Sequence, residues 1–223
     1  MKTFVPHFEI LPEEQKTFWG GLSPCKNLGF VLYGGTAIAL QLGHRSSVDF
    51  DFFSHIPLDT PKEKELLDSL PFLRNSGLIQ SAPNTRSYLT ANNVKFSFFG
   101  GIRLGRISEP RLTSDGVLQA ASLDDLMAMK LAVILQRVEA KDYKDIAAML
   151  RHGVSLAKGM GGAGALYGKQ FAPSESLKAM TYFQGGDLRN LPPNDKDTLL
   201  EAARTIPLNE LPQVKRLSDN LMG

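Results

Sequence analysis

The sequence lacks several features that define whole classes of protein. Its 223 residues include 1 cysteine, Cys25, which excludes an internal disulfide framework and gives no zinc site. No apolar run approaches the length of a membrane span. The N-terminal segment carries Pro6, Glu9, Glu13 and Glu14 where a signal peptide needs an apolar stretch. We therefore expect a cytoplasmic protein that does not associate with membranes.

The chain also lacks a strong charge of either sign. Its formal net charge is +2, which is too small to indicate a nucleic-acid binder by itself. Hydrophobic residues make up 43% of the chain and charged residues 22%, which is typical of a globular protein. The length suits one large domain or two small ones with an ample core.

The most informative stretch runs from Phe30 to Phe53. Residues 30–33 are bulky and favour a strand, Gly34-Gly35 interrupts it, and residues 36–42 favour a short helix that ends at Gly43. Residues 48–53 alternate as a strand does, so Asp49 and Asp51 share one face. The order is therefore strand, glycine turn, helix, loop and strand.

Two carboxylates on one strand face repel each other unless a cation lies between them. Asp49 and Asp51 offer the hard oxygen ligands that suit Mg²⁺ (or Mn²⁺), which typically binds one or two carboxylates together with substrate phosphates. The backbone of Gly34-Gly35-Thr36 can approach a phosphate at the start of a helix. This combination favours phosphoryl or nucleotidyl transfer. Each part alone is weak, because a pair of glycines is usually a turn and an exposed carboxylate pair is usually solvated.

The combined pattern resembles a known family. Gly34-Gly35-Thr36, followed by His44-Arg45-x-Ser47-x-Asp49-x-Asp51-x-Phe53, is similar to the signature of the DNA polymerase β nucleotidyltransferase superfamily, and most of all to the AbiEii/AbiGii toxin family. The resemblance implies a metal site at Asp49 and Asp51 and phosphate binding at the glycine turn. It also makes Arg45 and Ser47 candidate phosphate ligands, although Arg45 also suits a loop anchor and Ser47 a turn former.

Residues 122–150 carry a second part of the resemblance. Ser122 and Asp125 predict a capping box that opens a helix with an apolar stripe continuing to Val138. The family pattern that follows places its essential lysine and aspartate at Lys130 and Asp142, as a stabiliser of phosphate charge and a candidate general base. Asp142 with Asp145 also suits the cap of a second helix.

Two further cations follow Lys130. Arg137 and Lys141 come seven and eleven residues later, so a continuous helix would place both on the side of Lys130, where they become candidate ligands of a triphosphate. Long side chains that extend from a helix border into water fit these positions equally well.

The strand expected over residues 94–99 departs from the family pattern. Nucleotidyltransferases of this superfamily commonly carry a third acid on a strand beside the first two, and this chain has Ser97 there. A hydroxyl is a weak Mg²⁺ ligand and a poor base. The sequence therefore leaves open whether the acid is dispensable, replaced by another residue, or lost together with activity.

The sequence predicts an α+β fold: a polymerase β-like nucleotidyltransferase mixed sheet with flanking helices over residues 1–118, then a helical domain over residues 119–223. The glycine-rich residues 156–169 are expected to link helices flexibly, because no strand precedes them and no Gly-Lys-Ser/Thr ends them as in a phosphate loop. Helices are expected over residues 195–205 and 210–221.

By resemblance, the expected function is transfer of a nucleotidyl group from an NTP to an acceptor. The acceptor would be an RNA such as a tRNA end, and the protein a toxin countered by an antitoxin. Two alternatives stay open. One is a module that binds NTP and Mg²⁺ without turnover, which Ser97 favours. The other is a small-molecule nucleotidyltransferase of the aminoglycoside-modifying kind, against which the arginines of residues 100–115 count mildly. The nucleotide, the acceptor and the oligomeric state are not predicted.

Overall fold

The structure is a computed structural model that describes residues 2–223, apart from the side chain of residue 62. Within these residues the chain forms two compact units. Unit 1 comprises residues up to 105 together with 109–121 and 218–223, and unit 2 comprises 106–108 and 122–217.

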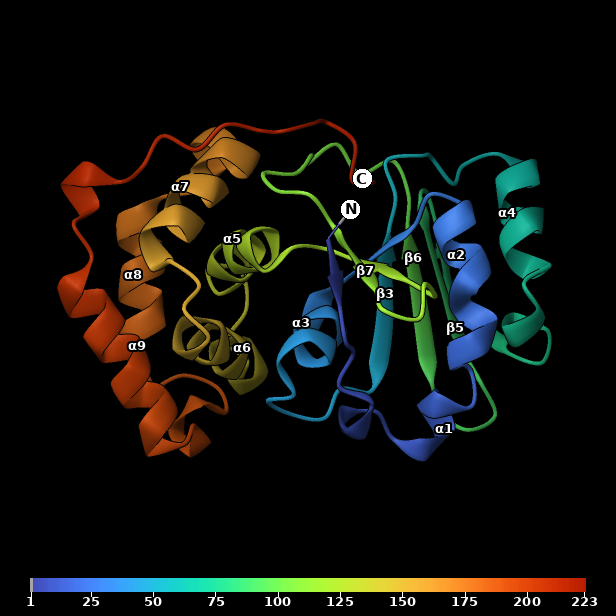
Figure 1. Ribbon diagram of the computed structural model, residues 1–223, viewed down its shortest axis with the longest axis horizontal. Helices are drawn as coiled ribbons and strands as arrows, with labels where there is room; N and C mark the ends of the chain where they lie inside the picture. Colours follow the sequence, from blue (N-terminus) through green and yellow to red (C-terminus); the bar gives the residue numbers. More distant parts are fainter. Residues whose placement is uncertain (1) are drawn as a thin grey trace. The chain divides into compact units, whose positions relative to one another are not determined.

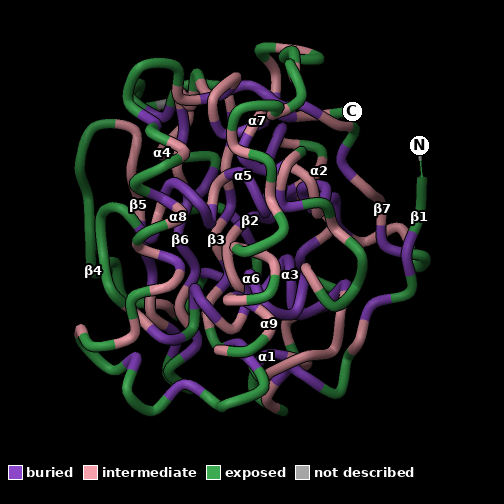
Figure 2. The backbone as a smooth tube through the Cα atoms, turned by 90° about the vertical axis from the view of Figure 1, so that its left-hand side faces the viewer, coloured by how far each residue is buried: buried purple, intermediate pink, exposed green. Residues whose placement is uncertain are grey.

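Unit 1 is built on a mixed sheet of 8 strands within the described residues. In chain order, the strands are β1 (Thr3–Phe4), β2 (Val31–Tyr33), β3 (Asp49–Phe53), β4 (Gly77–Ala82), β5 (Thr85–Leu89), β6 (Lys95–Phe99), β7 (Arg111–Thr113) and β8 (Gln119–Ala120). Their order across the sheet is β1-β7-β8-β2-β3-β6-β5-β4. The central strands β2, β3 and β6 are largely buried, whereas β4 at one edge is exposed along its whole length (Figure 2).

Helices cover both faces of this sheet. The helices of unit 1 are α1 (Glu13–Lys16), α2 (Ser23–Asn27), α3 (Gly34–Leu42), α4 (Pro61–Asp68) and the 3-10 turns η1 (Phe8–Ile10), η2 (Trp19–Leu22) and η3 (Pro71–Leu73). Helix α3 lies on one face of the central strands, and α2 and α4 lie on the other (Figure 1). The stretch from strand β2 through α3 to β3 therefore follows the order that the sequence predicts.

Aromatic packing fixes the register of the central strands. Phe50 and Phe52 of β3 are fully buried, and their rings stack on Phe96 and Phe98 of β6 with centroids 5.2 and 5.3 Å apart. A shift of one residue would turn these rings to the opposite face, so the core specifies which residues of β3 point the other way.

Unit 2 is helical within the described residues. Its helices are α5 (Leu123–Val133), α6 (Ala140–Arg151), α7 (Leu156–Tyr167), α8 (Pro173–Thr181), α9 (Pro193–Thr205) and the 3-10 turns η4 (Gly168–Gln170), η5 (Leu188–Asn190) and η6 (Leu208–Glu210). The predicted capping of α5 is confirmed, because the Ser122 hydroxyl accepts a hydrogen bond from the Asp125 backbone N–H at 3.0 Å.

Helix α5 is shorter than its apolar stripe predicts. It ends at Val133, and Leu135 and Val138 beyond it are 37% and 46% exposed. Helix α6 begins only at Ala140, with Glu139 as its N-cap. The prediction of one helical side for Lys130, Arg137 and Lys141 is therefore wrong, and so is the assignment of Asp142 as a helix cap.

The glycine-rich segment is a helix and not a flexible link. Helix α7 spans it, and a Cβ at Gly159 would collide with Met127 of α5, as one at Gly162 would with Ile107. Each glycine costs roughly 1 kcal/mol of helix propensity. Close packing of α7 on α5 offsets this cost. The periodicity of the sequence does not reveal this packing.

The predicted helix over residues 210–221 is absent from the described structure, whereas α9 confirms the one over residues 195–205. Pro212 lies inside the predicted helix and has no N–H to donate to a helix backbone. Instead, Arg216 donates from Nε to the Ala165 carbonyl at 3.0 Å and from Nη2 to that of Leu166 at 2.9 Å.

The observed architecture confirms the α+β class, with a mixed sheet, flanking helices and a helical C-terminal region. Among the described residues, no helix is both long enough and apolar enough to cross a membrane.

Candidate functional site

The two predicted metal ligands lie on the same face of β3. Asp49 and Asp51 alternate with the buried Phe50 and Phe52, and both are half-buried. Their carboxylates therefore share the sheet face opposite the aromatic core. Because Phe50 and Phe52 are buried on the other face, the core holds the two carboxylates side by side on this one.

Helix α3 begins directly beside Asp51. Gly34, its first residue, has φ +72°, and a Cβ at that position would lie 2.8 Å from Oδ2 of Asp51. The turn therefore needs glycine twice, for its left-handed backbone and for the close approach of the carboxylate. The start of a helix also carries unpaired N–H groups and partial positive charge, which favour an anion.

Two hydroxyl groups tie α3 to β3. The Thr36 hydroxyl donates to the backbone carbonyl of Asp49, and it lies 2.7 Å from the hydroxyl of Ser47. Because Thr36 has one proton and donates it to Asp49, Ser47 donates to Thr36. The structure thus gives the two predicted phosphate ligands a positioning role at the carboxylate strand. Arg45 donates from Nη1 to the Ser46 carbonyl at 2.9 Å.

The neighbouring strand β6 completes this face. Asp51 is directly opposite Ser97, and Asp49 is directly opposite Lys95, in parallel register. Ser97 is 1% exposed, and its hydroxyl lies 3.4 Å from that of Ser87. An acid at position 97 would therefore stand beside Asp51. Sequence analysis missed Lys95, although its alternation with Ser97 along residues 94–99 places both on one face.

The arrangement fits a hard divalent cation. Asp49 and Asp51 supply two oxygen-bearing side chains on one strand face, and helix α3 begins at Gly34 beside Asp51. Among the described residues, no group of three or more His, Cys, Asp and Glu is placed to hold a metal. Mg²⁺ characteristically binds one or two carboxylates and completes its shell with water and substrate phosphates.

Unit 2 contains a buried cluster of charges. Lys130 Nζ lies 2.5 Å from Oδ1 of Asp142 and 2.6 Å from Oδ2 of Asp145, and the three side chains are 7%, 0% and 0% exposed. Lys130 comes from α5, and both aspartates come from α6. The cluster therefore joins two helices through groups that would be costly to bury singly.

Arg137 closes this cluster from the connection between the two helices. It donates from Nε to Asp142 Oδ2 at 2.9 Å and from Nη2 to Oδ1 at 3.1 Å, a two-pronged contact. Burial raises the pKa of Asp142, but the hydrogen bond from Arg137 and the charge of Lys130 outweigh it and hold the pKa below the usual value. Asp142 is therefore a carboxylate at neutral pH.

Lys141 is not part of the buried cluster. Its side chain is 51% exposed, and its ammonium lies 2.8 Å from Glu139 Oε2. Of the predicted residues in unit 2, the structure thus brings together Lys130, Asp142 and Arg137, and places Lys141 in a surface ion pair.

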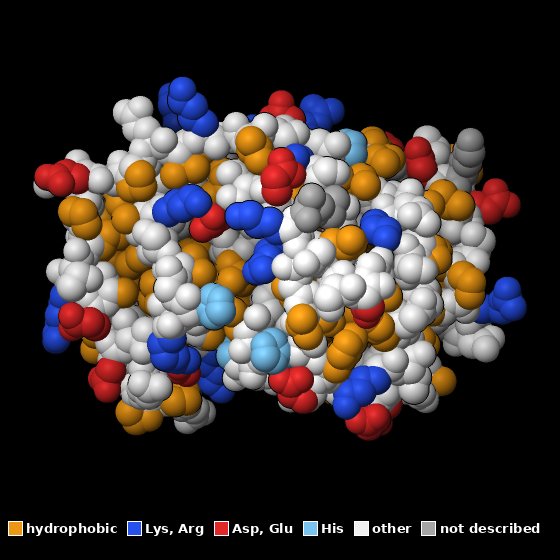
Figure 3. All heavy atoms as spheres, viewed as in Figure 1, with side chains coloured by type: hydrophobic (Ala, Val, Ile, Leu, Met, Phe, Trp, Pro, Cys, Tyr) orange, Lys and Arg blue, Asp and Glu red, His pale blue; other side chains and the backbone are white. Residues whose placement is uncertain are grey.

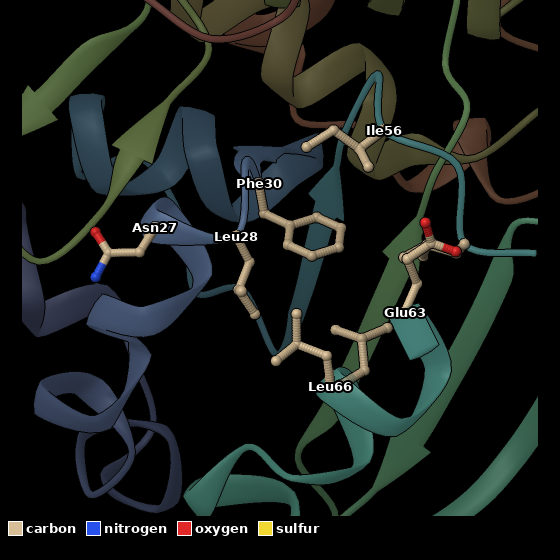
Figure 4. A pocket seen from close by; sticks show the side chains of 8 residues that line it. Asn27, Leu28, Phe30, Ile56, Glu63 and Leu66 are labelled. Carbon is tan, nitrogen blue, oxygen red and sulfur yellow. The ribbon is translucent and has the colours of Figure 1, made fainter. Parts of the chain in front are cut away.

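A separate apolar pocket lies on the opposite face of the sheet in unit 1. It has a volume of about 250 Å³ and includes Phe30, whose ring packs on Phe52 and Phe98 of the aromatic core. Leu28 and Leu66 converge on the same space (Figure 4). This pocket belongs to the face covered by α2 and α4 and does not include the carboxylate pair.

Known proteins resemble the chain in sequence and structure. The family model described as "Nucleotidyl transferase AbiEii toxin, Type IV TA system" matches residues 26–204. An uncharacterized protein from Aquifex aeolicus (strain VF5) is 34% identical over 130 residues, which cover 57% of this chain and 61% of that protein. The matched part is thus less than two thirds of that relative's length.

A solved structure gives a weaker likeness. The crystal structure of an antigenic nucleotidyltransferase-like protein from Paracoccidioides brasiliensis covers 90% of this chain and 94% of its own, with 16% identity and a TM-score of 0.47.

The fold and the site define an α+β protein with paired carboxylates beside a glycine turn that opens a helix. The family match spans most of the chain, including that turn, both carboxylates and the charge cluster of unit 2. The chain belongs to the AbiEii family of nucleotidyl transferase toxins, which the description of that family assigns to type IV toxin–antitoxin systems. The resemblance inferred from the sequence is thereby confirmed.

Proposed function

We propose that this protein transfers a nucleotidyl group from an NTP to an acceptor, with Mg²⁺ or Mn²⁺ held by Asp49 and Asp51. The observation that carries the proposal is the placement of Asp51 beside the left-handed turn at Gly34, with Asp49 on the same strand face, in a member of the AbiEii family. A metal bound there would neutralise negative charge on the phosphates.

The residues of unit 1 have distinct parts in this proposal. Asp49 and Asp51 hold the metal, and the backbone N–H groups at Gly34 and Gly35 hold phosphate oxygens at the start of α3. Thr36 and Ser47 keep α3 and β3 together through their hydroxyl groups. Arg45 belongs to the same loop and is a candidate phosphate ligand.

The transfer step is a displacement at phosphorus. An acceptor hydroxyl oxygen forms a bond to the α-phosphorus, the bond to the oxygen that bridges the α- and β-phosphates breaks, and pyrophosphate leaves. The hydroxyl proton passes to a base.

The roles of Lys130 and Asp142 stay predictions within this proposal. Lys130 would stabilise phosphate charge, and Asp142 would accept the proton. Both oxygens of Asp142 already contact Lys130 or Arg137. Although burial raises its pKa, these cations hold the pKa of Asp142 below its usual value, so it is a weak base while both remain in contact. Arg137 and Lys141 remain candidate ligands of the triphosphate, and each has an ion-pair partner in the structure.

We propose RNA as the acceptor class, a toxin as the biological role, and a cognate antitoxin as the partner. Family membership supports the toxin role. The face shown in Figure 3 carries Lys and Arg side chains among Asp and Glu side chains.

Label transfer tests the proposal. The protein is incubated with each α-labelled NTP, Mg²⁺ and total bacterial RNA, beside Asp49→Ala, Asp51→Ala and Lys130→Ala. Label on an RNA band that disappears in Asp49→Ala and Asp51→Ala is the expected result. Metal-dependent NTP binding that persists unchanged in Asp49→Ala would overturn the metal assignment. NTP binding without label on RNA, protein or small molecules would favour a binding module and would assign the lack of turnover to Ser97 in place of an acid.

A further inference from the structure

Lys95 stands beside the carboxylate pair. In the parallel pairing of β3 and β6, Lys95 is the register partner of Asp49, and Ser97 is the partner of Asp51. Paired residues on adjacent strands point to the same face and are separated by about 4.8 Å across the strands. The face therefore presents two acids on one strand, with a cation and a hydroxyl beside them on the next.

The charged ends of Lys95 and Asp49 do not bind each other. Among the described side chains, neither the Lys95 ammonium nor the Asp49 carboxylate has a partner within hydrogen-bond or ion-pair distance. Both residues are half-buried. A surface lysine normally extends into water. Lys95, however, is paired across the strands with Asp49, which is a candidate metal ligand.

The charge balance of this face indicates what Lys95 can bind. With Asp49, Asp51 and Lys95, the face carries a net charge of about −1, whereas an acid at position 97 and no lysine would give about −3. A metal at the two carboxylates brings the phosphates of its nucleotide to the same face. A lysine there adds attraction for a polyanion that a third acid would repel.

We propose that Lys95 is a further nucleotide-binding residue, whose ammonium contacts triphosphate oxygens of the NTP beside the metal held by Asp49 and Asp51. The inference rests on the proposed function and adds to it a residue that the sequence pattern did not indicate. Lys95 would then supply positive charge in addition to that of the metal, on the face where the third acid is missing.

Two binding measurements test Lys95, and they are expected to change in opposite directions. In Lys95→Met, affinity for a non-hydrolysable NTP analogue with Mg²⁺ should fall by about tenfold or more, because a hydrogen bond to a charged group is lost. Affinity for Mn²⁺ without nucleotide should rise severalfold, because a cation near Asp49 is removed. Calorimetry measures the first quantity, and electron paramagnetic resonance measures the second.

Matched variants separate binding from folding. Lys95→Arg keeps the charge and should restore most of the affinity for the analogue. Lys64→Met removes one positive charge from α4, on the other face of the sheet, and should match the wild-type protein in both measurements. Far-ultraviolet circular dichroism and thermal melting check that each variant is folded.

The proposal is overturned if Lys95→Met matches the wild-type protein in affinity for the analogue. It is also overturned if a folded Lys95→Met loses affinity for nucleotide and Mn²⁺ together, because that pattern indicates a disturbed carboxylate strand. Wild-type protein that binds no NTP analogue would refute the proposed function itself, and with it the role of Lys95. Binding by the wild-type protein that Asp49→Ala abolishes and Lys95→Met preserves would refute Lys95 alone.

Discussion

The ammonium of Lys130 lies 2.5 Å from Oδ1 of Asp142, and the Asp142 side chain is completely buried. Asp142 also accepts two hydrogen bonds from Arg137. Removing one member of a buried pair typically costs about 3–5 kcal/mol when the other charge is left without compensation. Asp145 still lies 2.6 Å from the Lys130 ammonium, so we expect Asp142→Ala to lower the free energy of unfolding by less than that, by up to about 3 kcal/mol, in urea denaturation.

Glu139 provides a control for this variant. It is the N-cap of the same helix, is 38% exposed, and pairs with Lys141 at 2.8 Å and more distantly with the half-exposed Arg137 at 3.6 Å. Exposed ion pairs contribute about 1 kcal/mol or less, so Glu139→Ala should change the free energy of unfolding by no more than that. Equal losses in the two variants would show that the buried cluster does not hold α5 and α6 together.

The same carboxylate predicts a pH dependence of stability. Its pKa in the folded protein lies below the ordinary value of 3.8, because Arg137 and Lys130 outweigh the effect of burial. The unfolded chain therefore binds a proton at a higher pH than the folded chain does. The stabilisation is complete only above about pH 5 and is lost as the pH falls through the folded-state pKa.

Comparison with Asp142→Asn isolates this titration, because other carboxyl groups are present in both proteins. The gap in unfolding free energy between wild-type protein and Asp142→Asn should shrink as the pH is lowered from 6 to 3. Urea denaturation at several pH values measures the gap. A gap that stays constant or widens toward acid would contradict a lowered pKa.

The hydroxyl bridge between Thr36 and Ser47 predicts a coupled pair. Thr36 is 2% exposed, Ser47 is 7% exposed, and Thr36 also donates to the carbonyl of Asp49. Thr36→Val should lower the free energy of unfolding by about 1–3 kcal/mol, since it leaves a buried acceptor without its donor. Ser47→Ala should cost less, because Thr36 keeps its bond to Asp49.

A double-mutant cycle checks this coupling. Because Ser47 acts through Thr36, the double variant should cost less than the sum of the two single variants. Strict additivity would show that the two hydroxyl groups act independently. Ser47→Ala that abolishes NTP binding in a fully stable protein would instead favour direct phosphate contact.

Substitution of Gly34 should lower both the stability of the protein and its affinity for NTP. Gly34→Ala places a Cβ 2.8 Å from Oδ2 of Asp51 and retains a φ of +72°. The left-handed backbone alone costs about 1–2 kcal/mol for a residue with a Cβ, and the carboxylate must also move. We expect a lower melting temperature and a loss of metal-dependent NTP binding. Gly20→Ala is the control, because a Cβ there meets nothing within 4 Å.

The site of unit 1 follows closely from local sequence. The prediction of a strand, a glycine turn, a helix and a second strand agrees with β2, α3 and β3 to within a residue or two at their ends. Alternation along β3 is strong because Phe50 and Phe52 are fully buried. Lys95 was missed because its importance comes from pairing with β3, which is a contact between distant residues.

Unit 2 shows what local patterns cannot reveal. The capping of α5 by Ser122 is a local signal and is confirmed. The burial of Lys130 depends on ion pairs with two residues of another helix. Helix α7 was missed because helix propensity penalises glycine, whereas the contact with α5 requires it.

In helix α7, substitution of glycine by alanine should change the free energy of unfolding in opposite directions at two positions. A Cβ at Gly159 would collide with Met127, whereas one at Gly164 meets nothing within 4 Å. Gly164→Ala should raise the free energy of unfolding by up to about 1 kcal/mol, through helix propensity alone. Gly159→Ala should lower it by about 1–3 kcal/mol, because α5 and α7 must separate or repack.

Thermal melting and urea denaturation of the two variants measure these changes. The two substitutions add the same methyl group to one helix, so the difference between them reports packing and not propensity. Stabilisation by both would mean that α7 does not pack on α5 through its glycines. Destabilisation by both would mean that the segment around Gly164 is not helical. It would then be the flexible link that the sequence pattern predicts.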